Sequence, residues 1–80
     1  MKTMTCKQLG GPCDHPLRAN SFDEIAMLAS KHGREMVGNG DQAHIQAMNE
    51  MRQQMTSAEA VQRWMAEKRQ AFEATPDDTQ

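Results

Sequence analysis

The two cysteines of this chain, Cys6 and Cys13, stand on either side of a segment that cannot form a helix. Four helix breakers follow the first cysteine closely: Gly10, Gly11, Pro12 and Pro16. Breakers at this density exclude a helix over residues 2–19. The stretches "MTCKQL" and "CDHPLRA" instead favour two short strands. We therefore expect a β-hairpin that turns through Gly-Gly-Pro and brings the two sulfurs towards each other.

The hydrophobic period changes at residue 21, where a helix is expected to begin. The sequence "SFDE" is a capping box, in which Ser21 accepts from the backbone N–H of Glu24 and the Glu24 carboxylate reaches back. Five residues then follow the i, i+3, i+4 spacing of one helical face: Ile25, Leu28, Ala29, His32 and Met36. This face should point inward, and Gly38 is suited to ending the helix.

Two more helices are predicted in the C-terminal half. Asp41 can cap the first, and the box "TSAE", from Thr56 to Glu59, can cap the second. Because the connection is short, we expect an antiparallel helical hairpin over residues 41–74. Its internal seam would pair Met48, Met51 and Met55 with Val61, Trp64, Met65 and Phe72. Residues 75–80 are expected to form a frayed tail.

The length fits one domain over residues 1–80. Its predicted parts are a hairpin-plus-helix module at residues 2–38 and the helical extension at residues 41–74. The predicted fold class is α+β: a short N-terminal β-hairpin packed on an α-helix, followed by an antiparallel two-helix hairpin. The core of so small a domain is marginal, so a metal, a disulfide or a partner subunit would add stability.

Charge and hydropathy argue against several classes of function. The formal net charge is −2, and nine Lys and Arg residues are spread along the chain. Nucleic-acid binders are usually basic, so we expect neither nucleic acid nor an anionic membrane surface as a partner. No apolar stretch approaches the about 18 residues of a transmembrane helix, and the first residues lack the apolar region of a signal peptide. We expect a cytoplasmic protein with reduced thiols.

The cysteines and histidines point to a zinc site, because zinc takes four ligands from Cys, His and sometimes carboxylate side chains. Cys6 and Cys13 from the hairpin and His32 from the next helix are three ligands on converging elements. His15 is the best candidate for the fourth, since in an extended segment it faces the same side as Cys13. His44 reaches the site only if the second predicted helix folds back over the first.

Two other interpretations of the cysteines stay open. Both can be small buried apolar residues, with His32 as a core or helix-end histidine. They can also form a disulfide across the hairpin, which a reducing compartment disfavours.

The stretch "MTCKQLGGPCDHPLRANSFDEIAMLASKHGREM" resembles the small bacterial family known as domain of unknown function 1059, whose members are labelled predicted small metal-binding proteins. The shared features are an N-terminal Cys, the pair Cys13-Asp14, Ala19, the capped acidic helix start, and "H-x-R-E" from His32. The resemblance covers about residues 4–38 and implies a Cys/His metal site with Cys6, Cys13 and His32 as ligands. The family commonly has a second His where this chain has Val37, which leaves the fourth ligand open.

The leading hypothesis is a small metal-binding module of zinc type, structural and without catalytic activity. An 80-residue chain with three helices offers little concave volume for an active site. The alternative is a metal-free interaction module. It would self-associate or bind a protein partner through Met-rich helices, by way of Met48, Met51, Met55, Trp64 and Met65.

Overall fold

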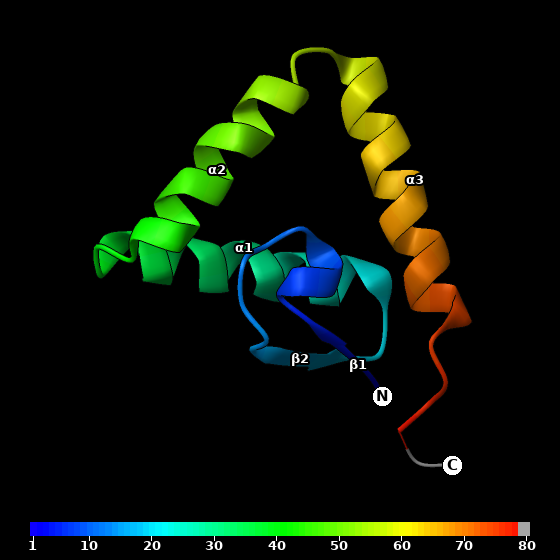
Figure 1. The fold of residues 1–80 in the computed structure, drawn as a ribbon. Coiled ribbons are helices and arrows are strands. Elements are labelled where there is room, and N and C mark those ends of the chain that lie inside the picture. The colour runs from blue at the N-terminus through cyan, green and yellow to red at the C-terminus, as the bar shows by residue number, and fades with distance from the viewer. Residues whose placement is uncertain (79–80) are drawn as a thin grey trace.

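The fold is α+β, as predicted. The computed structural model describes residues 1–78 and contains a two-stranded antiparallel hairpin followed by three α-helices (Figure 1). In chain order the elements are β1 (Lys2–Thr5), the 3-10 helix η1 (Lys7–Leu9), β2 (Pro16–Ala19), α1 (Phe22–Gly38), α2 (Gln42–Gln54) and α3 (Ala58–Ala74). Within the described residues, no helix combines the length and the apolar character needed to cross a membrane.

The strands are shorter than expected and leave both cysteines outside them. β1 pairs with β2 so that Met4 lies opposite Leu17, and Cys6 and Cys13 belong to the connection between the strands. Part of this connection is η1, so the prediction that no helix forms over residues 2–19 is wrong for this one 3-10 turn. It ends at Gly10, whose φ of 98° lies in the left-handed region that favours glycine.

The core lies between one face of the hairpin and α1, with one side chain contributed by α3. Successive strand residues point to opposite faces, so each strand turns a buried side chain towards α1. The two phenylalanines of the chain meet edge to face, with ring centroids 6.3 Å apart. The buried apolar cluster consists of Met4, Leu9, Leu17, Ala19, Phe22, Ile25 and Phe72.

Helix α1 begins where the capping box predicts. The Ser21 Oγ accepts from the backbone N–H of Glu24 at 3.2 Å. Leu28, expected on the inward face, is 37% exposed. The buried stripe runs through Phe22 and packs Ala29 against the core, so Leu28 falls at its edge.

The caps of the other two helices follow the sequence closely. Asp41 caps α2, as predicted. The cap of α3 is Ser57 rather than Thr56: its Oγ accepts from the backbone N–H of Ala60 at 3.1 Å. Ser57 has the extended backbone that a capping residue needs, and the helix therefore begins one residue later than the capping box suggested.

Helices α2 and α3 run in opposite directions but diverge from their connection like the arms of a V (Figure 1). The predicted seam is therefore open, and Met48, Met51 and Trp64 line a cavity instead. The hairpin connection reaches between the arms: a Cβ built on Gly10 would lie 3.1 Å from Met51 Cε and 3.2 Å from Trp64 Cζ2. Contact with the η1 turn thus takes the place of continuous helix-to-helix packing.

The sequence predicts a frayed tail over residues 75–80, but hydrogen bonds join Asp78 to the N-terminal hairpin. The Asp78 carboxylate accepts from the Thr3 hydroxyl at 2.7 Å and from Arg18 Nε at 3.2 Å. Its backbone N–H donates to the carbonyl of Met1 at 2.7 Å. Residues 79 and 80 lie outside the described residues.

We predict that Asp78→Asn lowers the melting temperature at neutral pH and that this loss disappears in acid. The hydrogen bond from Thr3, and then Arg18, lowers the pKa of Asp78. A carboxyl with a lowered folded-state pKa stabilises the fold above its unfolded pKa of about 3.9, and the contribution is lost as pH falls through the folded pKa. Thermal melts from pH 7 to pH 2 would test this. A constant difference between the two proteins across that range would contradict it.

Candidate metal centre

The connection between β1 and β2 folds around Cys6. The carbonyl of Cys6 accepts from the backbone N–H groups of Leu9, at 3.1 Å, and Gly11, at 2.8 Å. Across the connection, the backbone N–H of Lys7 donates to the carbonyl of Cys13 at 2.8 Å. These bonds fix the backbone next to both cysteines. The Cys6 side chain is buried, the Cys13 side chain is half-buried, and both thiols are free.

Gly11 makes room for the first sulfur. A Cβ at this position would lie 2.2 Å from Cys6 Sγ, closer than any real contact allows. The glycines of the predicted turn therefore have separate roles: Gly10 supplies the left-handed backbone, and Gly11 leaves space for Cys6 Sγ.

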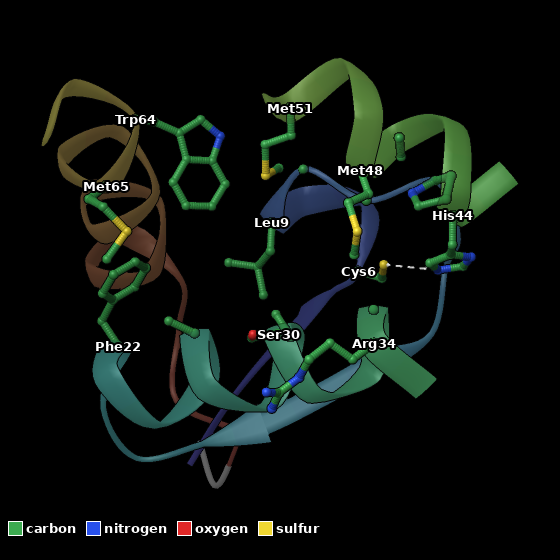
Figure 2. Close-up of a pocket in the computed structure, with 17 residues that line it drawn as sticks. Cys6, Leu9, Phe22, Ser30, Arg34, His44, Met48, Met51, Trp64 and Met65 are labelled. Carbon is green, nitrogen blue, oxygen red and sulfur yellow. Dashed lines mark hydrogen bonds between the residues drawn. The ribbon is translucent and has the colours of Figure 1, made fainter. Parts of the chain in front are cut away.

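Two helices bring histidines to this pair of sulfurs. His32 comes from the second half of α1, and its Nε2 lies 3.3 Å from Cys13 Sγ. His44 comes from the first turn of α2, and its Nε2 lies 3.7 Å from Cys6 Sγ, the contact drawn as a dashed line in Figure 2. One ligand atom from each of the four residues lies within 4.8 Å of the other three.

These separations suit a tetrahedral ion. In a zinc site, ligand atoms about 2.0–2.3 Å from the metal lie about 3.3–3.8 Å from one another. The sulfur-to-nitrogen distances of the Cys13–His32 and Cys6–His44 pairs, 3.3 and 3.7 Å, fall in that range. The remaining pairs lie within 4.8 Å of one another, and the farthest would have to approach by about 1 Å to bind one zinc ion. Two thiolates and two imidazoles also form one of the usual ligand sets of structural zinc.

Asp41 orients the fourth member of the cluster. Its Oδ2 accepts from the Nδ1–H of His44 at 2.6 Å and from the backbone N–H of the same residue at 2.9 Å. The hydrogen bond from the His44 side chain lowers the pKa of Asp41, so the group is a carboxylate that only accepts. Nδ1 of His44 therefore carries a proton, and Nε2 is the ring nitrogen that lies towards Cys6. Metal-bound histidines commonly have a carboxylate partner of this kind.

In the absence of a bound cation, burial favours the uncharged forms of the Cys6 thiol and the His32 imidazole. Burial raises the pKa of the Cys6 thiol, which favours the protonated form. Burial, and then the neighbouring His15 and His44, lower the pKa of His32, so its imidazole is neutral at pH 7. A bound divalent cation would reverse the preference of Cys6 for the protonated thiol, because a thiol that coordinates a metal loses its proton.

The structure brings together three of the four residues singled out from the sequence, namely Cys6, Cys13 and His32, and adds His44. His15 is not in this group: its exposed ring stacks on His32, with centroids 4.4 Å apart and planes 7° apart. The fourth position therefore lies beyond residues 4–38. A four-residue site can therefore form even though this chain has Val37 where the resembled family commonly has a second His.

His44 becomes a neighbour because α2 folds back over α1 after a short turn. The Asn39–Asp41 connection includes Gly40, whose φ is 82°, and backbone bonds from this turn return to the end of α1. A sequence signal for His44 does exist: a capping Asp stands three residues before it, which places the carboxylate beside both its backbone and its ring.

No family model, curated protein or solved structure matches this chain. The inference of a metal centre therefore depends on the geometry of the four side chains.

We predict that Gly11→Ala destabilises the protein by about 1–3 kcal/mol, the usual cost of forcing a methyl group into occupied space. Cys6 Sγ must move, so zinc affinity should fall as well. Gly33→Ala is the matched control, because a Cβ there has no neighbour within 4 Å. It should stabilise α1 by up to about 1 kcal/mol. Urea unfolding of both variants tests the contrast, and equal stability of the two would contradict it.

We predict that Asp41→Ser weakens zinc binding by about 10–100-fold, because His44 loses its carboxylate partner. Serine is itself a good capping residue, so α2 should keep its stability. Asp41→Ala, which removes both roles, should lower zinc affinity and helix stability together. Ser57→Ala removes a cap from α3 alone and should leave zinc affinity unchanged. Competition with a chromophoric chelator measures affinity, and unchanged affinity in Asp41→Ser would refute the positioning role.

Proposed function

We propose that this protein is a small zinc-binding module in which the ion stabilises the fold. The observation that carries the proposal is the convergence of Cys6, Cys13, His32 and His44, whose ligand atoms lie within 4.8 Å of one another. The four residues come from both ends of the hairpin connection, from α1 and from α2. A single ion at this point would join three parts of the chain.

Zinc fits this site better than other common ions. Thiolate ligands disfavour magnesium and calcium, which prefer oxygen. A tetrahedral arrangement of two sulfurs and two nitrogens is typical of zinc.

A structural role is favoured over a catalytic one. Catalytic zinc sites use three protein ligands and keep the fourth position open for water or substrate. Here the protein supplies four candidate ligands, the number that completes a tetrahedral site and leaves no open position. The small apolar cluster gives a reason for such a site, because small domains commonly need a metal or a disulfide in addition to their core.

We predict that untagged protein, purified without chelator or immobilised metal, carries one zinc per chain in native mass spectrometry. Cys13→Ser and His44→Ala should each abolish stoichiometric zinc. His15→Ala should retain it, because His15 stacks on His32 and is not part of the four-residue cluster. A chelator should lower the melting temperature of the native protein and of His15→Ala but leave that of Cys13→Ser unchanged, because metal-binding energy is folding energy here.

A metal-free mass with two freely alkylated thiols would refute the proposal. So would a melting temperature of the native protein that ignores the chelator.

A further inference from the structure

A cavity of about 410 Å³ lies in the opening between α2 and α3, and Cys6 and His44 of the candidate metal centre line part of it. The prediction from the sequence of little concave volume is therefore wrong. Figure 2 shows its walls: Trp64 and Met65 come from α3, Met48 and Met51 from α2, and Leu9 lies between them. α1 and the hairpin connection around Gly10, Gly11 and Pro12 supply the remaining walls. The volume is within the range of about 300–1,000 Å³ that is typical of small-molecule sites.

The lining is almost entirely apolar. Leucine, phenylalanine, alanine, tryptophan and three methionines form most of the walls. Methionine side chains adapt their shape to an apolar guest, and Met-rich surfaces are common where ligands vary. An apolar chain would therefore find both volume and adaptable contacts in this cavity.

Four side chains of the lining carry polar or ionisable groups: Cys6, Ser30, Arg34 and His44. Cys6 and His44 belong to the candidate metal centre, whereas Ser30 and Arg34 are exposed. Of the Lys, Arg, Asp and Glu residues that the structure describes, only Arg34 lines the cavity. Ser30 stands one turn earlier on α1, at the i, i+4 spacing that puts two side chains on the same face, and it also lines the cavity (Figure 2). In the described part of the chain, the Arg34 guanidinium has no hydrogen bond or ion pair. A donor-only group of fixed positive charge beside a hydroxyl is suited to a carboxylate.

We propose that this cavity binds a small amphipathic carboxylate, with its alkyl chain between the methionines and Trp64 and its carboxylate on Arg34 and Ser30. The charge of Arg34 and the apolar walls select this chemistry over a neutral or cationic amphiphile. The proposal goes beyond zinc binding and does not require an open position on the metal.

Trp64 provides a direct readout, because it is the single tryptophan of the chain and lines the cavity. Zinc-loaded protein, freed of excess metal, is titrated with decanoate below its micellar concentration while Trp64 emission is recorded. Decyltrimethylammonium, with the same alkyl chain and the opposite charge, is titrated in parallel. We expect a saturable one-to-one blue shift with decanoate and much weaker binding of the cationic analogue.

Two pairs of variants locate the site. Arg34→Gln should weaken decanoate binding about tenfold, the effect of losing one charge-assisted hydrogen bond. Lys31→Gln, the same loss of charge on an exposed position of α1 outside the cavity, should not change it. Ala47→Phe places a ring into the cavity and should block binding, whereas Ala43→Phe, on an exposed position of α2, should not.

Four results would overturn the proposal. The first is equal affinity for decanoate and for decyltrimethylammonium, which would mean that the alkyl chain alone binds and that Arg34 does not select the carboxylate. The second is the absence of a saturable change. The third is binding that ignores Arg34→Gln, which would place the carboxylate somewhere other than on Arg34. The fourth is a dimer in sedimentation equilibrium that buries Trp64 and resists decanoate, which would make a second copy of the chain the occupant.

Discussion

The meeting of two cysteines and two histidines is the constraint on which the rest of this structure depends. Helix α2 shows this most clearly, because its one buried residue is His44, a polar side chain. The other two helices are anchored by aromatic or aliphatic groups: α1 by Phe22 and Ile25, and α3 by Phe72. His44 is therefore the most deeply buried link between α2 and the rest of the fold, and it contacts Asp41, Cys6 and a metal ion if one is bound.

A buried histidine is a poor anchor unless its polar atoms are satisfied, because an unpaired buried polar group costs free energy. Asp41 satisfies Nδ1, and a zinc ion would satisfy Nε2. The same ion would stabilise the thiolate of Cys6, which burial alone disfavours. Each polar group of the cluster is thus unfavourable in an apolar setting and favourable around a dication. The site and the fold support each other for this reason.

The open angle between α2 and α3 follows from the same arrangement. α2 is directed by His44 towards the hairpin connection, and α3 is directed by Phe72 towards the hairpin core and by Lys2 Nζ, which donates to the Phe72 carbonyl at 3.0 Å. With their far ends fixed at two separate points and the η1 turn between them, the helices diverge. Their methionines and Trp64 then line a cavity instead of a closed seam.

Local signals in the sequence predicted local structure well. The caps Ser21 and Asp41, the three helices, and the candidate ligands Cys6, Cys13 and His32 could all be identified from short patterns. The sequence did not predict the features that depend on contacts between residues far apart along the chain. The cysteines leave the strands because the connection wraps around the Cys6 carbonyl, and the predicted seam opens because its helices are anchored elsewhere.

The sequence favoured His15 as the fourth ligand and allowed His44 only if the second predicted helix folded back over the first. The role of His44 depends on α2 folding over α1, and the spacing of Cys and His residues does not encode that fold. His15 satisfied the local rule for a strand, which places alternate residues on one side. In the structure His15 lies just before β2, not inside a regular strand, and its ring stacks on His32.

Zinc K-edge X-ray absorption of the purified, metal-loaded protein tests the central claim most directly, because it reports the atoms bound to the ion. The four-residue site predicts two sulfur ligands at about 2.3 Å and two nitrogen ligands at about 2.0–2.1 Å. A first shell made only of oxygen and nitrogen, or one with a single sulfur, would show that Cys6 and Cys13 do not hold the metal together and would contradict this account of the fold.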